Sequence, residues 1–226
     1  MTDGSLQTGS TATFGRPLLA ILIAVWLLLV AAGMAVLACY SNKPGLTGTP
    51  PAIWPPGSRL ELARDQPTLL LFAHPRCPCT RATMGELMRT VADCRGRLQV
   101  QVLFVRPGSL PGGLVHSDLY RRAETAPGVA VSIDDGGREA ELFGARTSGH
   151  VLLYNARGEL MFSGGLTASR GHEGGNVGRT AVVAAVRGLA TARQRSTVFG
   201  CPLQSPESLA THSNRSIAHC LGINDE

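Results

Sequence analysis

One uncharged apolar segment near the N-terminus constrains this chain more than any other feature of its sequence. No charged side chain occurs in the 22 residues from Pro17 to Ala38. As a helix rising about 1.5 Å per residue, this segment would be about 33 Å long, enough to cross the hydrocarbon core of a bilayer. The alternative is a buried helix of a soluble protein, but such helices usually keep a polar face. The sequence therefore predicts a transmembrane anchor over residues 17–39, preceded by an N-terminal tail of residues 1–16.

The charges on the two sides of the anchor do not by themselves decide its orientation. Arg16 and the terminal amine precede it, and Lys43 and Arg59 follow it. However, an apolar segment behind a single arginine is typical of an uncleaved signal anchor, and the six cysteines suit an oxidising compartment. We therefore expect a single-pass protein of the bacterial inner (cytoplasmic) membrane, with its C-terminal domain extracytoplasmic, in the periplasm.

The end of the apolar segment also allows a second form of tethering. Val36-Leu37-Ala38-Cys39 resembles a lipoprotein processing site, because a small residue precedes a cysteine. Cleavage there would replace the helix with lipid on Cys39, although Leu37 is bulkier than such sites usually carry. In either case residues 40–58, rich in Pro, Gly, Ser and Thr, are predicted to be a linker that lifts the domain off the membrane.

The rest of the chain has room for one domain of roughly 150 residues. The net charge of +5 comes almost wholly from arginine, because Lys43 is the only lysine. The arginines are scattered along the chain, whereas a nucleic-acid-binding domain gathers its basic residues on one face. We therefore expect no nucleic-acid partner.

The order of the predicted elements indicates an α/β fold. Residues 68–73 form an apolar run, such as a central strand needs when both of its faces are buried. The predicted elements are strand 68–73, helix 79–93, strand 98–105, helix 114–125, strand 129–133, a hairpin of 150–154 and 159–163, and helix 177–193 with Asn176 as its N-cap. Crossovers through helices require parallel pairing, whereas a hairpin is antiparallel, so the sheet must be mixed. Residues 196–226 are predicted to be a partly mobile C-terminal tail.

Two cysteines separated only by Pro78 lie where the first predicted strand ends and a helix begins. Free N–H groups and the helix dipole at such a turn favour a thiolate, and can lower a cysteine pKa from about 8.5 to roughly 3.5–7.5. The neighbouring His74 and Arg76 would act in the same direction. A thiolate with a second sulfur one residue away meets the requirements of reversible disulfide exchange. We therefore predict that Cys77 and Cys79 are catalytic residues of a thiol-disulfide oxidoreductase.

Residues 60–195 resemble the thioredoxin-like superfamily, and within it the membrane-anchored bacterial thiol-disulfide proteins and the RedB group. The resemblance lies in the cysteine pair with its proline, in Glu141-Leu142-Phe143-Gly144-Ala145 before the hairpin, and in Gly164-Gly165-Leu166 after it. It implies a thioredoxin-like mixed β-sheet flanked by helices over residues 59–195, with an extra strand before the hairpin. It also implies a redox-active disulfide bond, no cofactor, and a partner protein that supplies a thiol or a disulfide.

The chain departs from the pattern of this superfamily in two places. The family motif is Cys-x-x-Cys, so a disulfide across Pro78 alone would be strained and easily reduced. The family also places a cis-proline before the hairpin strand, where it keeps metals off the thiols and aligns a substrate strand, whereas this chain has Ser148-Gly149-His150. An alternative is therefore a copper-binding or copper-delivery protein of thioredoxin fold that uses His74, Cys77 and Cys79. A redox-silent module that only binds partners is a third interpretation.

The glycine-rich segment 164–178 is expected to border the cysteine pair. His172 and Glu173 within it are candidates to relay protons or bind a ligand, and the alternative is a solvated pair on a surface loop.

The other sulfurs have separate interpretations. Cys94 extends the apolar face of its helix, which predicts a core position. Cys201 and Cys220 are predicted either to form a structural disulfide or to leave Cys201 as a resolving thiol for the active pair. A zinc or copper site that adds His212 and His219 to these two cysteines is a further alternative, although its spacing matches no standard pattern.

Overall fold

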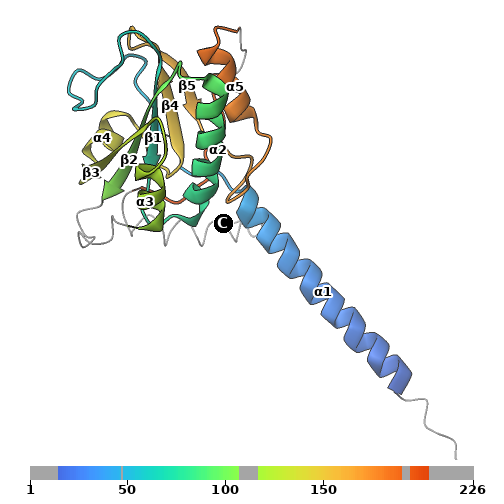
Figure 1. Ribbon diagram of the computed structural model, residues 1–226. Coiled ribbons are helices and arrows are strands. Elements are labelled where there is room, and N and C mark those ends of the chain that lie inside the picture. Colours follow the sequence, from blue (N-terminus) through green and yellow to red (C-terminus); the bar gives the residue numbers. More distant parts are fainter. Residues whose placement is uncertain (1–14, 47, 107–116, 190–193, 204–226) are drawn as a thin grey trace, which may run out of the picture. The chain divides into compact units, whose positions relative to one another are not determined.

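The computed structural model of the protein describes residues 15–46, 48–106, 117–189 and 194–203 (Figure 1). The chain divides into two compact units, Met1–Cys39 and Tyr40–Glu226. The first unit consists of helix α1 in its described part, and the second contains every strand and every other helix of the described residues.

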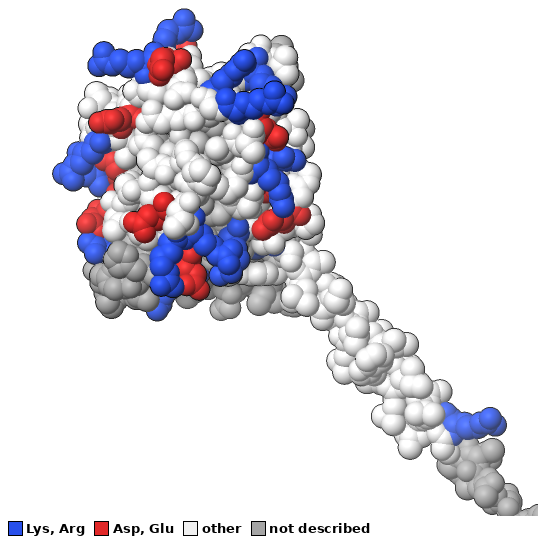
Figure 2. Space-filling model, in the orientation of Figure 1, with Lys and Arg blue, Asp and Glu red and all other residues white. Residues whose placement is uncertain are grey.

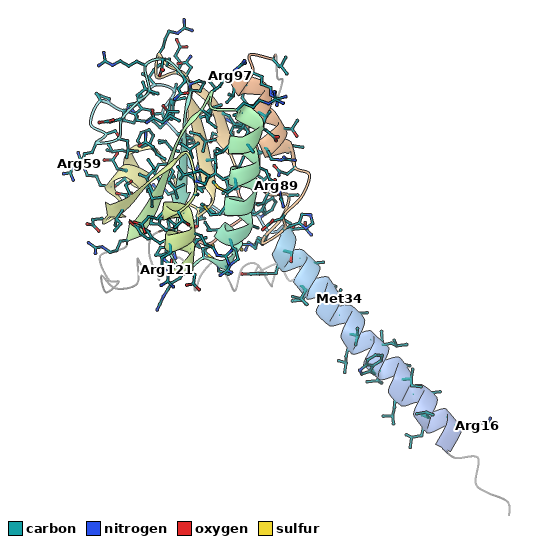
Figure 3. All side chains as sticks on the ribbon, in the orientation of Figure 1. Arg16, Met34, Arg59, Arg89, Arg97 and Arg121 are labelled. Carbon is teal, nitrogen blue, oxygen red and sulfur yellow. The ribbon has the colours of Figure 1, made fainter. Side chains whose placement is uncertain are left out.

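Helix α1 covers Gly15–Asn42 and carries the apolar segment. At about 1.5 Å per residue its 28 residues extend about 42 Å. Arg16 is its only charged residue and lies at its first turn, while apolar side chains such as Met34 are exposed along its length (Figure 3). None of its residues is buried. By length and composition α1 is therefore a candidate transmembrane helix, as predicted from the sequence.

The second unit is built on one five-stranded mixed sheet. Its strands are β1 (Thr68–Ala73), β2 (Gln99–Arg106), β3 (Val129–Asp135), β4 (His150–Tyr154) and β5 (Leu160–Gly164), in the order β3-β2-β1-β4-β5. β1 pairs in parallel with β2, and β2 with β3, whereas β4 is antiparallel to both β1 and β5. Because β1 is central and covered on both faces, all six of its residues are buried.

Helices cover both faces of the sheet. They are α2 (Pro78–Cys94), α3 (Asp118–Glu124), α4 (Arg138–Leu142) and α5 (Val177–Val186). Apolar residues of α2, α3 and α5 pack on the face that carries Leu71, and Figure 1 shows α2 lying across the sheet near α5. Cys94 belongs to this core and is 2% exposed, as predicted. Residues of α4 pack on the opposite face with Phe72.

Most element bounds lie within two residues of the predicted ones, and the differences have local causes. α5 ends at Val186, before the predicted end at 193, because Arg187 leaves the helical geometry. Asn176 caps α5 as predicted, accepting from the N–H of Arg179 at 2.7 Å. The short α4 was not predicted. It begins where the Asp134 carboxylate accepts from the N–H groups of Glu139 (2.9 Å) and Ala140 (2.8 Å).

Several described residues of the predicted linker, residues 40–58, pack against the rest of the second unit. Trp54 lies edge-on to Phe143 and Tyr154, with ring centroids 5.0 and 5.2 Å apart. Gly48 approaches the chain so closely that a Cβ there would lie 1.7 Å from the Gly144 carbonyl oxygen. This segment therefore contributes apolar surface to the core, which the Pro- and Gly-rich composition did not indicate.

Residues 194–203 also differ from the prediction of a mobile tail. The backbone N–H of Ser163 donates to the Gln194 carbonyl (3.0 Å), and the N–H of Ser196 donates back to the Ser163 carbonyl (3.2 Å). A Cβ on Gly164 would lie 2.2 Å from Ser196 Oγ, so the bare glycine lets the two segments approach. Residues 194–203 are therefore part of the folded unit. Residues 204–226 lie outside the described residues.

Charges are mixed on the surface of the second unit. Figure 2 shows acidic and basic side chains interspersed on its visible face. Ion pairs account for part of this pattern, such as Arg157 with Glu159 at 3.0 Å and Arg179 with Asp93 at 3.1 Å.

Candidate functional site

Cys77 lies at the point where the chain passes from β1 into α2. It is the N-cap residue of α2 and has extended backbone angles (φ −80°, ψ 112°). Pro78 is the first helical residue, where its missing N–H costs no helical hydrogen bond. Cys79 follows in the first turn. Both sulfurs therefore lie at the positive end of the helix dipole, which favours a negative charge.

The sulfur of Cys77 is the acceptor at the centre of a buried cluster. Only 3% of Cys77 is exposed. The thiol of Cys201 donates a hydrogen bond to it, as do the thiol of Cys79 and the hydroxyl of Thr80, and these bonds hold the pKa of Cys77 far below its usual value despite burial. Because Cys79 and Cys201 donate to Cys77, their own pKa values are raised. These hydrogen bonds therefore favour the thiolate at Cys77 and the protonated thiol at Cys79 and Cys201.

Ser148 connects the loop before β4 to this cluster. Its hydroxyl oxygen accepts from the backbone N–H of His74 (2.7 Å) and lies 2.6 Å from the hydroxyl oxygen of Thr80. Since Thr80 donates to Cys77, the Ser148 hydroxyl donates to Thr80, which completes a chain of hydrogen bonds that ends at the thiolate. The described residues contain no cis peptide bond, so Ser148 occupies this loop with an ordinary trans backbone.

His74 is half-buried beside the pair. Burial lowers the pKa of His74, and the thiolate of Cys77 opposes that effect. Its Nδ1 accepts from the backbone N–H of Arg76 at 3.2 Å, so the neutral ring carries its proton on Nε2. Arg76 itself is exposed.

Arg170 lies in the glycine-rich segment 164–178, which was expected to border the cysteine pair, but this arginine was not predicted from the sequence as a site residue. Its Nε donates to the carbonyl oxygen of Lys43 (3.2 Å), and its guanidinium lies 5.1 Å from the ring centre of Tyr40. Arg170 also hydrogen-bonds to Cys79, and it lowers the pKa of that thiol against the larger upward effect of Cys77. No motif marks this arginine, because its position depends on the packing of residues 40–43.

Cys201 reaches the cluster on a short stretch of antiparallel backbone pairing. Thr147 and Pro202 form a bridge between the loop before β4 and the segment that follows residue 194. The N–H of Ser148 donates to the Cys201 carbonyl at 2.8 Å, and the N–H of Leu203 donates to the Arg146 carbonyl at 2.9 Å. The structure therefore brings Cys201 next to Cys77, although the two are far apart in sequence.

Comparison with solved structures identifies the fold of the second unit. An uncharacterized conserved protein from Geobacillus kaustophilus matches at 18% identity and a TM-score of 0.52, with 73% of this chain and 94% of that chain covered. The hypothetical protein SMc02350 from Sinorhizobium meliloti 1021 matches at 19% identity and a TM-score of 0.52, over 72% and 94% of the two chains. The exposed lipoprotein thioredoxin Etrx1 from Streptococcus pneumoniae matches at 19% identity and a TM-score of 0.38, over 56% and 87%.

No protein-family model matches the chain, and no curated protein matches it in sequence. At these identities a structural match shows the fold alone. In this chain β1 is central, β4 is antiparallel to its neighbours, and a cysteine pair lies at the β1–α2 turn. The second unit has a thioredoxin-like fold. The mixed sheet flanked by helices that the sequence predicted is thereby confirmed, and β3 is the extra strand before the hairpin.

In this thioredoxin-like unit the residues after Ser148 contribute unequally to the site. Gly149 has φ +93°, and a Cβ there would lie 3.1 Å from Thr83 Oγ1, so only glycine fits without strain. The ring of His150 turns to β5, where Nε2 hydrogen-bonds to Ser163 Oγ at 2.9 Å. Its Nδ1 is buried without a hydrogen-bond partner among the described residues, and burial lowers the pKa of His150 to about 4.

The glycine-rich segment places its acidic residue along α2 rather than at the cysteine pair. Glu173 pairs with Arg89 at 3.1 Å and lies against Gly85, which is about 9 Å along the helix from Cys79. His172 and Glu173 are both exposed. We expected this pair to border the site, but the structure holds its segment by hydrogen bonds to the buried carboxylate of Glu86, including one of 2.8 Å from the N–H of Gly174.

The remaining predicted sulfurs and ligands have these positions. Cys201 carries a free thiol beside Cys77, so the structure does not contain the predicted disulfide of Cys201 with Cys220. Cys220 itself lies outside the described residues, as do His212 and His219. Within the part of the chain that the structure describes, no group of three or more His, Cys, Asp or Glu side chains is arranged to hold a metal ion.

Proposed function

We propose that this chain is a membrane-tethered thiol-disulfide oxidoreductase whose catalytic domain lies outside the cytoplasm and whose catalytic residues are Cys77, the nucleophile, and Cys79, which donates a hydrogen bond to its sulfur. One observation carries the proposal. The sulfur of Cys77 lies at the N-terminus of α2 and accepts hydrogen bonds from two neighbouring thiols, which keeps it ionised. An ionised sulfur is the nucleophile in disulfide exchange, and a protonated thiol beside it can complete the exchange.

The reaction has two steps that balance in sulfur bonds and protons. The Cys77 thiolate attacks one sulfur of a partner protein's disulfide, which breaks that disulfide and forms a mixed disulfide, while the leaving partner thiolate takes a proton from water. A second thiol of the site, such as Cys79, loses its proton and attacks Cys77, which releases the second partner sulfur. The partner is reduced by two electrons and the site is oxidised by two, and the reverse sequence oxidises a partner.

The site fits a protein substrate better than a small one. Cys77 is almost fully buried, so a partner sulfur reaches it only where backbone can be displaced or added next to Ser148. In this proposal the candidate transmembrane helix α1 tethers the domain and keeps it near partners at the outer face of the inner membrane. No cofactor is required for the exchange, because both electrons move between sulfur atoms.

The first test is a redox titration of the full chain in detergent. The protein is equilibrated in glutathione or dithiothreitol buffers of stepped potential, free thiols are trapped, and each cysteine is counted by mass spectrometry. We expect a reversible two-electron transition that includes Cys77 and that disappears in Cys77→Ala. Cys94→Ala is the matched control, because Cys94 lies in the core and should leave the transition in place.

Two outcomes of that titration would contradict the proposal. Thiols that stay reduced at every potential would leave a redox-silent module that only binds partners. Thiols protected by tightly held copper, detected by metal analysis of the same sample, would favour the copper-delivery alternative based on His74, Cys77 and Cys79.

A further inference from the structure

The segment that carries Cys201 is built into the site by its backbone. Two hydrogen bonds flank the bridge between Thr147 and Pro202, one at Ser148 (2.8 Å) and one at Leu203 (2.9 Å). Backbone pairing of this kind fixes the position of a residue independently of its own side chain. The sulfur of Cys201 is therefore held beside Cys77 by main-chain geometry.

Close packing on both sides of Cys201 supports the same conclusion. A Cβ on Gly200 would lie 1.9 Å from the Ser148 carbonyl oxygen, so this approach requires a glycine. After it, the side chain of Leu203 is 1% exposed in the core that contains Phe72 and Phe143. A loosely attached tail would have neither the glycine contact nor the buried leucine.

The segment that carries Cys201 pairs with the loop before β4, next to the sulfur of Cys77. The backbone N–H of Ser148 donates to the Cys201 carbonyl, and the Ser148 hydroxyl oxygen accepts a hydrogen bond from the N–H of His74. An incoming protein strand would need the same N–H of Ser148 in order to lie against the site. The segment therefore occupies the position of a partner strand, with its cysteine in contact with Cys77.

Cys79 is less well placed than Cys201 to form a disulfide with Cys77. Cys77 and Cys79 are separated only by Pro78, so a disulfide between them would close a very short and strained ring, although the two sulfurs are in contact. Pro78 between them has a fixed φ, so the turn cannot easily deform to bring the sulfurs to bonding geometry. Cys201 lies on a separate segment, so a disulfide from Cys77 to Cys201 would not have to span a single proline.

We propose that Cys201 is the resolving thiol of the site and that the oxidised protein carries a Cys77–Cys201 disulfide. This inference rests on the proposed function and names the second sulfur of its second step. A partner displaces residues 200–203 and forms the mixed disulfide on Cys77. The segment then returns, Cys201 gives its proton to water, and its sulfur attacks Cys77 and releases the partner thiolate. Cys79 stays reduced and donates its hydrogen bond to the Cys77 thiolate.

Disulfide mapping on the wild-type full chain tests this directly. The protein in detergent is oxidised with excess oxidised dithiothreitol, free thiols are alkylated, and the linked peptides are identified by mass spectrometry. We expect a Cys77–Cys201 linkage with Cys79 alkylated. A linkage between Cys77 and Cys79, or between Cys201 and any other cysteine, would overturn the inference and leave the proposed function standing. The absence of any linkage to Cys77 would overturn both.

Matched variants separate chemistry from folding. Cys79→Ala is expected to form the same Cys77–Cys201 linkage as the wild type but more slowly, because Cys77 loses a hydrogen-bond donor that lowers its pKa. Cys201→Ala with oxidised glutathione is expected to accumulate a glutathione adduct on Cys77 at least tenfold over wild type, because the resolving sulfur is gone. Cys94→Ala is the control, because it also removes one thiol, which lies in the hydrophobic core outside the cysteine cluster. If Cys201→Ala resolved its adduct as fast as the wild type while Cys79→Ala did not, Cys79 would be the resolving thiol and the inference would be wrong.

Discussion

Hydrogen bonds, more than neighbouring charge, lower the pKa of Cys77. The donors to its sulfur are the thiols of Cys201 and Cys79 and the hydroxyl of Thr80, whereas Arg76 is exposed to solvent. Donors that favour the ionised form lower a pKa even where burial opposes it. The sequence predicted a thiolate at this turn from the helix dipole and nearby basic residues. It did not identify the donors, because Cys201 is brought to the site by long-range pairing.

Removing the main donor is expected to raise the pKa of Cys77. In Cys201→Ala the sulfur loses the hydrogen bond that contributes most to its low pKa. The thiolate absorbance near 240 nm should then rise at higher pH than in the wild type, by at least one pH unit. Cys94→Ala, which removes a thiol outside the cluster, should leave this part of the curve unchanged. An identical curve for wild type and Cys201→Ala would show that the Cys201 thiol does not stabilise the thiolate.

His150 is expected to make the fold less stable in mild acid. Burial lowers its pKa to about 4, below the value of 6.5 in an unfolded chain. Because the pKa of His150 is lower in the folded protein, protonation of this ring favours the unfolded state. The folded state is therefore most stable above pH 6.5, and it loses at most about 3 kcal/mol of stability as the pH falls from 6.5 toward 4. Urea unfolding at pH 7.5 and pH 4.5 should show a larger loss for the wild type than for His150→Gln. Equal losses would contradict this account.

Two segments outside the regular elements complete the second unit. Residues 48–54 include Trp54, which packs on one face of the sheet, and residues 194–203 pair with β5 and with the loop before β4. The first segment was predicted to be a linker from its Pro, Gly, Ser and Thr content, and the second was predicted in part to be a tail because its sequence is polar and irregular. In the structure, glycines in these segments allow two backbone segments to pack closely, as at Gly48 and Gly200.

A side chain at Gly200 is expected to loosen the segment that carries Cys201. Gly200→Ala would place a methyl group 1.9 Å from the Ser148 carbonyl oxygen, so the pairing must shift. The pKa of Cys77 should rise as in Cys201→Ala, and Cys201 should become more reactive toward maleimide. Gly57→Ala is the matched control, because a Cβ there meets nothing within 4 Å. Unchanged reactivity of Cys201 would mean that the segment is not held at Gly200.

The packing of Trp54 predicts that the segment before the sheet is part of the stable core. Trp54→Ala removes contacts with Phe143 and Tyr154 and is expected to lower the free energy of unfolding by about 2 kcal/mol, because the ring is only partly buried. Ile53→Ala is the control, since Ile53 is 59% exposed and its loss should change stability by less than about 0.5 kcal/mol. Urea unfolding of the full chain in detergent measures both. Equal effects would argue against docking of this segment.

In the whole molecule, the cysteine cluster lies in the second unit, whereas large apolar side chains are exposed along α1. Every side chain of the described part of α1 is at least partly exposed, and its exposed leucines and valines have no partner in a watery compartment. A membrane is the environment in which such a helix is stable. The thiolate cluster and its thioredoxin-like fold belong wholly to residues 40–203.

The orientation of the chain can be tested with a reporter that becomes active only where disulfides form. Alkaline phosphatase fused after Glu226 is expected to be active in intact bacteria, since the proposed function places the domain outside the cytoplasm. The same reporter on a chain without residues 15–39 should be inactive and should leave the membrane fraction. Activity of the shortened chain, or inactivity of the full one, would contradict the proposed orientation.

The apolar helix, the order of strands and helices, and the position of the cysteine pair at a strand-to-helix turn could all be predicted from the amino-acid sequence. These features depend on residues close together in the chain, so periodicity and turn chemistry indicate them. Three contacts could be found only in the folded protein: Cys201 with Cys77, Arg170 with Cys79, and Glu173 with α2. Such contacts form where two backbone segments that are distant in sequence can approach each other. The approach depends on individual glycines and buried side chains, and these leave no repeating pattern in the sequence.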